Sequence, residues 1–462
     1  MTTSLLQHDF DLAIIGGGAG GVLTALHALR LADAGTRIVL IEPIARLAQG
    51  VAYATTHAEH LLNVPARRMS AFDDKPDDFV DFLVAREGEA ARDGIAVSYA
   101  QRRHYGEYLR ERLEQARVTA AAYFEVLQDR VTAVDAGADA PTLQLESGAS
   151  IRARGAAMAV GNNPKPLPAR GASSLPHQSV LEAWDFDAIK QIPADAEICI
   201  AGSGLSMVDT ALSLAANGHR GRIHVLSRHA LLPLAHCKHA AADFDAEALL
   251  AMGLRQRMRV LRQAARDADR QGLPWQAVME SVRPWVQDLW RTLSHEDQRR
   301  FLRHVVRYWD VHRHRIAPQV HAQLEALQAS GQLRLHRGRL QTVAREGERI
   351  RLTMMMRDRR SQELDVDRIV NATGVEMRAQ LMRNPLLSDL LGEGNARSGP
   401  HGIGIDTRDD GAVLDAEGKA LPGVRVVGSL RIGRLWESIA VPELRGQAEN
   451  AARQLLGSLI AT

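Results

Sequence analysis

A short apolar run that ends in a glycine-rich turn near the N-terminus is the feature that most constrains the fold. Phe10 to Ile15 has the length of a buried parallel strand, and the motif Gly16-x-Gly18-x-x-Gly21 follows at once. Helical spacing of apolar residues continues from Ala19 to Ala34, and a second apolar run, Arg37 to Ile41, ends at Glu42. This order of strand, glycine turn, helix and strand predicts a right-handed βαβ unit.

The spacing of the three glycines is typical of a turn that holds a dinucleotide. Gly16 permits the tight turn, Gly18 lets a pyrophosphate approach the backbone, and Gly21 lets the helix pack closely on the strand. The N–H groups and the partial positive charge at the helix N-terminus favour phosphate oxygens. Glu42 stands where a carboxylate accepts hydrogen bonds from ribose hydroxyls. An ordinary glycine-rich turn is the alternative, and the complete order of elements weakens it.

The same pattern recurs in the middle of the chain. Strands are predicted at Glu197 to Ala201 and at Arg222 to Leu226, with the turn Gly202-Ser203-Gly204 and a helix from Leu205 to Ala216 between them. Met207 takes the place of the third glycine, so we expect helix and strand to stand further apart here. Ser227 and Arg228 follow the second strand at the position where NAD-specific domains carry an acid. An arginine there favours the 2′-phosphate of NADPH, and a solvated surface arginine is the alternative.

The length of 462 residues allows two or three domains. We expect an α/β protein with two Rossmann-like dinucleotide-binding domains and a helical insert. The expected segments are the first part of an FAD-binding domain (1–165), an NADPH-binding domain (190–335) with a helical insert (243–330), and a return segment of the FAD-binding domain (336–462). Further strands are predicted at Arg349 to Met355, Arg368 to Ala372 and Val424 to Val427, and a closing helix at Val441 to Leu456.

Charge and cysteine content exclude several classes of function. The formal net charge is only +2, which does not call for nucleic acid or an anionic membrane as a partner. Cys199 and Cys237 do not form a Cys-x-x-Cys pair, which argues against a disulfide reductase. The loop from His236 to His239 offers too few ligands for a metal site. No run approaches the roughly 20 apolar residues of a spanning helix, so we expect a cytoplasmic protein without a membrane partner.

As a set, these motifs resemble the FAD/NAD(P)-binding flavoproteins that carry two dinucleotide folds. More distantly, they are similar to the class B flavin monooxygenases and amine N-hydroxylases. The resemblance spans nearly the whole chain apart from most of the helical insert, and it is specific for the family rather than for a substrate. The stretches that carry it are Gly16 to Gly21, Gly50 to Tyr53, Leu61 to Pro65, Gly202 to Asp209, Ser227 to Pro233, Trp309 to Pro318, Asn371 to Gly374 and Trp436 to Arg445.

The resemblance implies a set of cofactor contacts. Gly50 to Tyr53 and Asn63 are expected near the flavin, and Gly428 is expected to begin the last FAD contact. Gly428-Ser429 stands where many relatives have Gly-Asp, so that contact has no carboxylate. The expected cofactor-binding residues are Gly16, Gly18, Ala19, Gly20, Gly21, Glu42, Pro43, Gly50, Tyr53, Asn63, Gly161, Gly202, Gly204, Leu205, Ser206, Ser227, Arg228, Thr373, Gly374, Gly428, Ser438 and Ile439.

The substrate side is less constrained by the sequence, and no side chain is singled out as catalytic. Trp309, Arg313 and Arg315 are expected either to line a pocket for an anionic substrate or to form a solvated helix face. The resemblance implies that NADPH reduces FAD and favours oxygen transfer from O₂ to a small amine or sulfur compound. Two alternatives to a monooxygenase remain. One is a flavin reductase or oxidase without oxygen insertion, and the other is a flavin-binding sensor without turnover.

Overall fold

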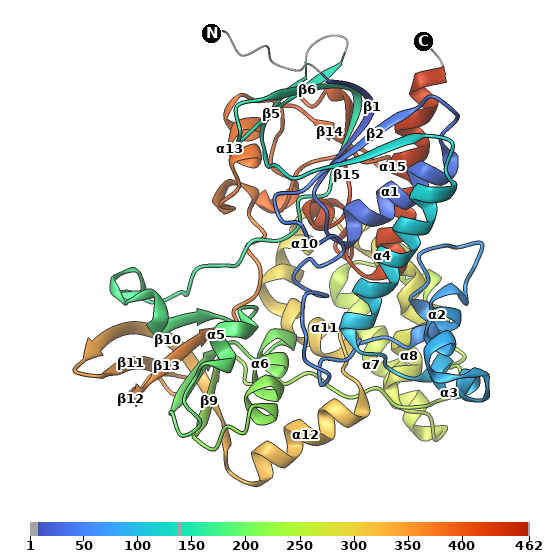
Figure 1. Cartoon of the computed structure of the whole chain (residues 1–462). Coiled ribbons are helices and arrows are strands. Elements are labelled where there is room, and N and C mark those ends of the chain that lie inside the picture. The colour runs from blue at the N-terminus through green and yellow to red at the C-terminus, as the bar shows by residue number, and fades with distance from the viewer. Residues whose placement is uncertain (1–7, 137–139, 461–462) are drawn as a thin grey trace. The chain divides into compact units, whose positions relative to one another are not determined.

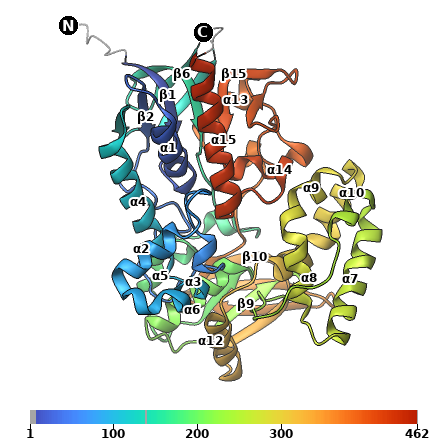
Figure 2. The ribbon, with the colours of Figure 1, turned by 90° about the vertical axis from the view of Figure 1, so that its right-hand side faces the viewer.

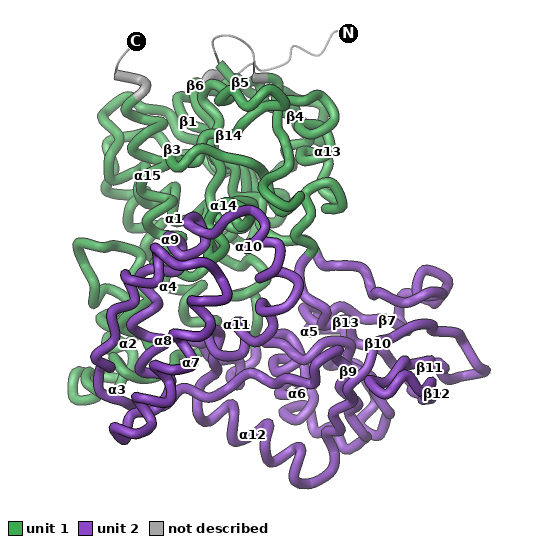
Figure 3. The backbone as a smooth tube through the Cα atoms, turned by 180° about the vertical axis from the view of Figure 1, so that it is seen from behind, with its two compact units in different colours: residues 1–56, 65–163, 376–462 green, residues 57–64, 164–375 purple. Residues whose placement is uncertain are grey.

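The computed structural model describes residues 8–136 and 140–460, and the chain divides into two compact units (Figures 1 and 3). Unit 1 consists of Met1–Thr56, Pro65–Asn163 and Glu376–Thr462. Unit 2 consists of His57–Val64 and Pro164–Val375. Each unit contains one of the two predicted glycine-rich turns.

Unit 1 is built on an eight-stranded sheet in which β14, β15, β6, β1, β2 and β3 lie in that order. The pairs β15–β6, β6–β1, β1–β2 and β2–β3 are parallel, and β4 and β5 extend antiparallel from β6. The strands are β1 (His8–Ile15), β2 (Arg37–Ile41), β3 (Tyr123–Leu127), β4 (Val131–Ala136), β5 (Pro141–Leu145), β6 (Ser150–Met158), β14 (Ala412–Leu414) and β15 (Ala420–Val426).

Two helices from distant parts of the chain pack together in unit 1. Helix α1 (Ala19–Leu31) begins directly after the first glycine turn and contacts α15 (Val441–Ile460), as Figure 2 shows. A methyl group built on Gly20 would lie 3.4 Å from Leu444, so the helices approach closely near the turn. The other helices of unit 1 are α2 (Asp78–Glu87), α3 (Arg92–Val97), α4 (Arg102–Thr119), α13 (Pro385–Gly392) and α14 (Ile432–Leu435).

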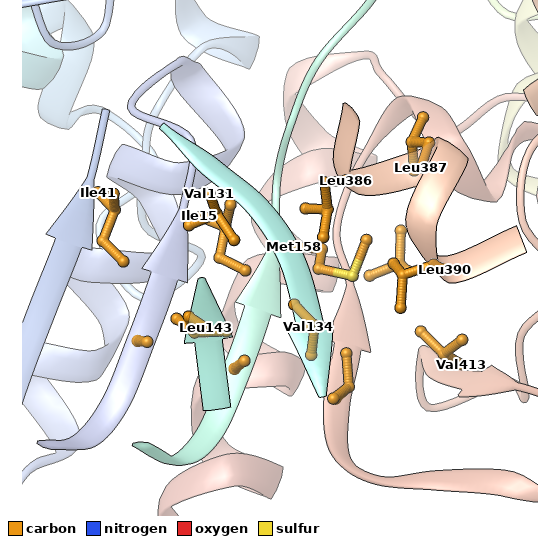
Figure 4. Close-up of a cluster of buried hydrophobic side chains, with 14 of the residues drawn as sticks. Ile15, Ile41, Val131, Val134, Leu143, Met158, Leu386, Leu387, Leu390 and Val413 are labelled. Atoms are coloured by element: carbon orange, nitrogen blue, oxygen red, sulfur yellow. The ribbon is translucent and has the colours of Figure 1, made fainter. Parts of the chain in front are cut away.

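A buried apolar cluster fixes the strands that lead into the first turn (Figure 4). Ile15, Ile41 and Met158 come from the ends of three parallel strands, and α13 covers them with three leucines that have no exposed surface. The labelled members are Ile15, Ile41, Val131, Val134, Leu143, Met158, Leu386, Leu387, Leu390 and Val413. Truncating a buried leucine of this kind to alanine costs about 2–5 kcal/mol. The cluster therefore holds the carboxyl ends of β1, β2 and β6 in register.

Unit 2 has a seven-stranded sheet in the order β12, β11, β10, β9, β8, β13 and β7. Its central order β13-β8-β9-β10 repeats the order β6-β1-β2-β3 of unit 1, and these strands are parallel. This confirms the predicted α/β fold with two Rossmann-like sheets. The strands are β7 (Val180–Glu182), β8 (Ile198–Ala201), β9 (Ile223–Ser227), β10 (Leu333–Glu346), β11 (Arg349–Met356), β12 (Ser361–Val366) and β13 (Arg368–Asn371).

The structure moves one expected boundary. The return to the first unit was expected at residue 336, but β10 to β13 complete the second sheet and unit 1 resumes at Glu376. The reason lies in the pairing, because β10 extends the sheet beside β9 and β13 lies beside β8. The strand-like runs 349–355 and 368–372 were therefore recognised as strands but attributed to the wrong sheet, whereas the run 424–427 belongs to unit 1 as expected.

The insert between β9 and β10 is helical, as predicted from its apolar spacing (Figure 2). Arg257 is 4% exposed and ties this insert together, since its guanidinium donates to the carbonyl of Met252 at 2.7 Å and to the hydroxyl of Thr292 at 2.9 Å. The helices of unit 2 are α5 (Phe186–Lys190), α6 (Leu205–Ala216), α7 (Leu254–Arg270), α8 (Trp275–Val282), α9 (Val286–Arg291), α10 (His295–Arg300), α11 (Val306–Arg313) and α12 (Pro318–Ala329).

Candidate functional site

The first glycine turn contains glycines of two kinds. Gly16 has φ 105°, and a methyl group there would lie 2.5 Å from the carbonyl oxygen of Ala159 at the end of β6. A methyl group on Gly21 would lie 1.7 Å from the carbonyl oxygen of Gly16. Packing alone therefore requires these two glycines. Gly18, by contrast, has φ −68°, and the nearest atom to its added methyl is the Cα of Gly50 at 4.0 Å. The protein itself leaves room for a side chain at Gly18, so a ligand is the natural reason for glycine at this position.

The N-terminus of α1 faces this open position without a capping side chain. Gly18 is the N-cap residue, so the first N–H groups of the helix, at Ala19, Gly20 and Gly21, have no side-chain acceptor from the cap. Glu42 accepts hydrogen bonds from Gly17 at 2.6 Å and from Ile44 at 3.1 Å, and Pro43 follows it. A carboxylate with two oxygens retains further acceptor sites for ribose hydroxyls.

The other expected FAD residues of unit 1 lie on loops beside the turn or on segments that contact it. A methyl group on Gly50 would lie 3.6 Å from the Cα of Gly18, which brings the two glycines together. Tyr53 packs on Tyr105 of α4, with ring centroids 4.8 Å apart. Gly161 has φ 74°, and the Ser429 hydroxyl donates to its carbonyl oxygen at 2.9 Å. The serine that replaces the usual acid therefore links two of the expected FAD segments.

The segment before α15 has the character of a contact surface for a ligand. Ser438 is fully buried, and its hydroxyl has no hydrogen-bond partner among the described residues. Ile439 beside it is 54% exposed, although isoleucine is usually buried. The Gly428 N–H, in contrast, donates to the Gln447 side chain at 3.0 Å, so this group is already satisfied within the protein. An orphan hydroxyl and an exposed apolar side chain beside a helix N-terminus suit the edge of a flavin ring.

The second glycine turn repeats the geometry of the first. Gly202 has φ 116°, and a methyl group there would lie 2.1 Å from the carbonyl oxygen of Ala372 at the end of β13. Gly204 is exposed, and no atom lies within 4 Å of its added methyl. Met207 is completely buried where unit 1 has Gly21. The second turn thus combines one glycine required by packing with one open glycine.

Ser227 occupies the position in unit 2 that Glu42 occupies in unit 1. The Gly202 N–H donates to Leu226 at 2.9 Å, as the Gly16 N–H donates to Ile41 at 2.9 Å. The hydroxyl oxygens of Ser203 and Ser227 lie 2.8 Å apart, which parallels the bond between Gly17 and Glu42. The residue that would recognise the adenosine ribose is therefore neutral in unit 2, and no carboxylate stands there to repel a phosphate.

The remaining expected residues of unit 2 lie at neighbouring strand ends. Leu205 and Ser206 form the first turn of α6, and the Ser206 hydroxyl accepts a hydrogen bond from Trp184 at 3.2 Å. The Thr373 hydroxyl donates to Asn371 at 2.7 Å, and Gly374 follows with φ 94°. Asn63 belongs to unit 2 rather than to unit 1, and its carbonyl accepts the Nε2–H of His236 at 2.8 Å.

A cluster of basic side chains surrounds Arg228. Partial desolvation lowers the pKa of its guanidinium, and the nearby positive charges of Arg307 and Arg339 lower it further. Burial and four arginines, including Arg337, likewise lower the pKa of His229. Arg307 is paired with Asp310 at 3.2 Å, but Arg228, Arg337 and Arg339 have no acidic partner in the described part of the chain. The excess positive charge is suited to an anion with more than one charge, such as a phosphate monoester.

Sequence reasoning found only one member of this basic cluster. Arg337 lies beside Ser227 because β10 pairs in parallel with β9, and Arg339 follows two residues later on the same face. Segment 333–346 was not recognised as a strand, so its arginines could not be brought to the turn. The alternation of Leu333 and Leu335 with polar residues was the available signal.

The expected substrate residues separate into two groups. Arg315 is 2% exposed and forms an ion pair with Glu280, while its Nε and Nη1 have no hydrogen-bond partner among the described residues. Trp275 stacks over its guanidinium at 5.8 Å. Arg313, 8% exposed, adds a second buried positive charge near Arg315. Trp309 instead packs edge-on against Phe301 and belongs to a different aromatic cluster.

The protonation of His236 and the burial of the two cysteines limit which acid–base and thiol reactions these side chains can perform. Burial lowers the pKa of His236 to about 4, with a further contribution from Arg315, so the imidazole is neutral at pH 7. Cys199 is fully buried, which raises its pKa to about 12 and removes it as a nucleophile. Cys237 is exposed and unpaired. Neither cysteine has a partner with which to form a disulfide in the described structure.

Comparison with known proteins identifies the fold. Residues 13–163 match the family described as FAD-NAD(P)-binding. The ornithine N-hydroxylase of Kutzneria sp. 744, solved with reduced FAD, NADP⁺ and L-ornithine, superposes with a TM-score of 0.69 at 17% identity, covering 98% of this chain and 100% of that chain. The L-lysine 6-monooxygenase of Pseudomonas syringae gives 0.69 at 16% identity over 96% and 99% of the two chains.

A disulfide reductase shares the fold to a lesser degree. The bacillithiol disulfide reductase of Staphylococcus aureus gives a TM-score of 0.59 at 14% identity, covering 98% of this chain and 99% of that chain. No curated protein sequence matches this chain. Among the described residues, no helix combines the length and the apolar character needed to cross a membrane. Residues 13–163 therefore match the FAD-NAD(P)-binding family, and the chain has the fold shared by these hydroxylase, monooxygenase and reductase structures.

Proposed function

We propose that the protein is an FAD-dependent oxidoreductase that is reduced by NADPH and transfers oxygen to a small amine. The observation that carries this proposal is the pair of glycine turns, each with one glycine that packing does not require. Gly18 and Gly204 both lack a steric reason within the protein for the absence of a side chain. A pyrophosphate at each helix N-terminus supplies that reason.

Unit 1 is the proposed FAD site and unit 2 the proposed NADPH site. Glu42 suits the unmodified ribose of FAD, whereas Ser227 and the arginines around Arg228 suit a 2′-phosphate. When bound, FAD supplies the redox chemistry and the reaction with O₂. The protein contributes the open turns that bind the pyrophosphates, the N-terminus of α15 with Ser438, and the exposed side chain of Ile439.

The stoichiometry of NADPH oxidation tests oxygen transfer. With the correct amine, one hydroxylated product is expected for each NADPH consumed, and little H₂O₂ should accumulate. NADPH oxidation that yields H₂O₂ in equal amount with every amine tested would instead favour an oxidase without oxygen insertion. A folded, flavin-loaded protein that NADPH fails to bleach would favour a non-catalytic sensor.

The shared fold also raises thiol chemistry as a second candidate, and the cysteines make it testable. Reduction of a disulfide through a paired dithiol requires two accessible cysteines, but Cys199 is buried and only Cys237 is exposed. Reduction of the bound flavin by NADPH should therefore persist in Cys199→Ser and in Cys237→Ser. Loss of flavin reduction in a folded, flavin-loaded Cys237→Ser protein would revive the thiol mechanism.

The charge of the buried arginine cluster supports a substrate with a carboxylate. Glu280 pairs with Arg315 and lies 3.9 Å from Arg283, and Arg313 adds a further positive charge. Two arginines thus lie close to the same glutamate, and Arg313 is near enough to Arg315 to lower the pKa of its guanidinium. The Nε and Nη1 of Arg315 have no hydrogen-bond partner among the described residues, so two donors of this guanidinium remain for a substrate carboxylate.

Amines with and without a carboxylate distinguish this role of Arg315. L-Ornithine or L-lysine should stimulate product formation at lower concentration than cadaverine, which lacks the carboxylate. Arg315→Lys keeps the positive charge beside Glu280 but loses the fork, and should raise the KM for the amino acid about ten- to a hundredfold. The KM for NADPH should not change, and Trp309→Phe serves as a control in the neighbouring cluster. Equal KM values for cadaverine and the amino acids would contradict the proposed role.

A further inference from the structure

The outward face of α7 carries a single row of arginines. Arg255, Arg259, Arg262 and Arg266 follow one another at intervals of four, three and four residues, which places them on one face of the helix. All four are exposed. The opposite face contains Leu254, Arg257 and Ala268, which are buried against the rest of the insert. The row is about 16 Å long, from the helical rise of about 1.5 Å per residue.

These four arginines differ from several other helical arginines of the described chain. Arg117, Arg291 and Arg300 each form an ion pair with an acid three or four residues before them, at 2.5–2.6 Å. The α7 row has no such pair among residues 8–136 and 140–460. Asp269 lies three residues after Arg266, yet it forms no ion pair with it. Within the row, the residues three or four positions away are other arginines, and only Arg266 also has an acid, Asp269, at such a position.

This arrangement works against the stability of the free helix. Like charges at intervals of three or four residues repel one another, and the row contains three such neighbouring pairs. Packing does not require the guanidinium groups, because they point away from the buried face. A destabilising feature without a role in packing is typical of a surface that serves recognition.

We propose that this row binds an acidic α-helix of a partner protein. Carboxylates that repeat at the same three- and four-residue intervals on a partner helix would face the four guanidinium groups one by one. Arginine suits this pairing because its planar fork holds a carboxylate by two parallel hydrogen bonds. Binding would also relieve the repulsion within the row, since each positive charge gains a negative neighbour.

The flanks of the row argue against a membrane or a nucleic acid as the partner. None of the strongly exposed large apolar side chains of the described chain lies on α7, so the helix has nothing to insert into lipid. On one side the row is bordered by Gln256, Gln263 and Arg270, which is paired with Asp267, and on the other by Asp269. The unpaired basic surface is therefore only one residue wide. A phosphate backbone or a lipid surface is engaged by a broader basic face, and an acid at the border repels both.

Two synthetic helical peptides test the inference on the full-length, flavin-loaded protein. One carries four glutamates at intervals of four, three and four residues, and the other has the same composition with the glutamates distributed around the helix. In fluorescence anisotropy at low salt, we expect the first peptide to bind at least about tenfold more tightly than the second. The affinity should fall as salt is raised. A short DNA duplex and vesicles of phosphatidylcholine and phosphatidylserine provide the competing partners.

A double variant separates a binding role from a folding defect. R259Q/R262Q should weaken binding of the first peptide about tenfold or more and should raise the melting temperature of the free protein, because repulsion is removed. The matched control R345Q/R357Q removes two exposed arginines from the β10–β11 region and should change neither value. Four outcomes would each overturn the proposal. They are equal binding of the two peptides, tighter binding of DNA or vesicles than of the first peptide, no peptide binding at low salt, and an equal loss of peptide affinity in R345Q/R357Q.

Discussion

Gly18→Val is expected to yield a folded protein without bound flavin. Gly18 has φ −68° and room for a side chain, so valine should be accepted by the backbone and by its neighbours. The branched side chain would occupy the space at the N-terminus of α1 in which the pyrophosphate is proposed to lie. Visible absorbance of the purified protein measures the flavin content, and circular dichroism with thermal unfolding measures the fold.

The internal repeat supplies matched controls for this result. Gly204→Val makes the same change in unit 2, where no atom lies within 4 Å, and should retain flavin but lose its reduction by NADPH. Gly21→Ala should instead disturb folding, because its methyl would lie 1.7 Å from a carbonyl oxygen. A yellow Gly18→Val protein with full flavin content would show that the pyrophosphate lies elsewhere.

Neutralising the basic cluster around Arg228 is expected to abolish the preference for NADPH. The wild-type protein should be reduced at roughly ten- to a hundredfold lower concentration of NADPH than of NADH, since a charge-assisted contact contributes on the order of 1.5–3 kcal/mol. Arg228→Ala should narrow this gap, and R337Q/R339Q combined with it should close the gap. NADH should be affected little, because it has no 2′-phosphate. The rate of flavin bleaching under anaerobic conditions is the measurement.

Salt and a control on the same strand complete this test. Arg228 is exposed, so increasing salt should erode the wild-type preference for NADPH. Arg345→Gln removes a charge from β10 at a position distant in sequence from the cluster and should leave the preference unchanged. If Arg228→Ala weakens both donors equally, the arginine supports the fold of the turn and does not recognise the phosphate.

The sequence predicted those parts of the fold in which a local pattern and the tertiary structure agree. The strand Arg37–Ile41 and the helix Leu205–Ala216 were predicted with the bounds that the structure shows. Both are buried elements in which apolar spacing directly reports the environment. The helical insert was also predicted, because the amphipathic spacing of α7 is repeated over several turns.

The sequence did not predict contacts that depend on pairing between distant strands. Strand β10 has arginines at positions that point away from the core, so its sequence lacks a continuous apolar run. Only its pairing with β9 brings Arg337 next to Ser227. The unpaired hydroxyl of Ser438 is likewise a property of three-dimensional packing. Local patterns therefore revealed the two turns, whereas the side chains that complete each site come from distant segments.

The pairing of α1 with α15 imposes an order on how unit 1 is completed during synthesis. In the chain, α1 precedes α15 by more than the whole of Pro164–Val375, so its apolar face emerges from the ribosome well before its partner. Unit 2 contains most of its own chain in one stretch and can close earlier, since domains generally fold as they are made. Until α15 arrives, α1 lacks part of its cover, so a chain that stops before residue 441 should be prone to aggregation and unable to hold flavin.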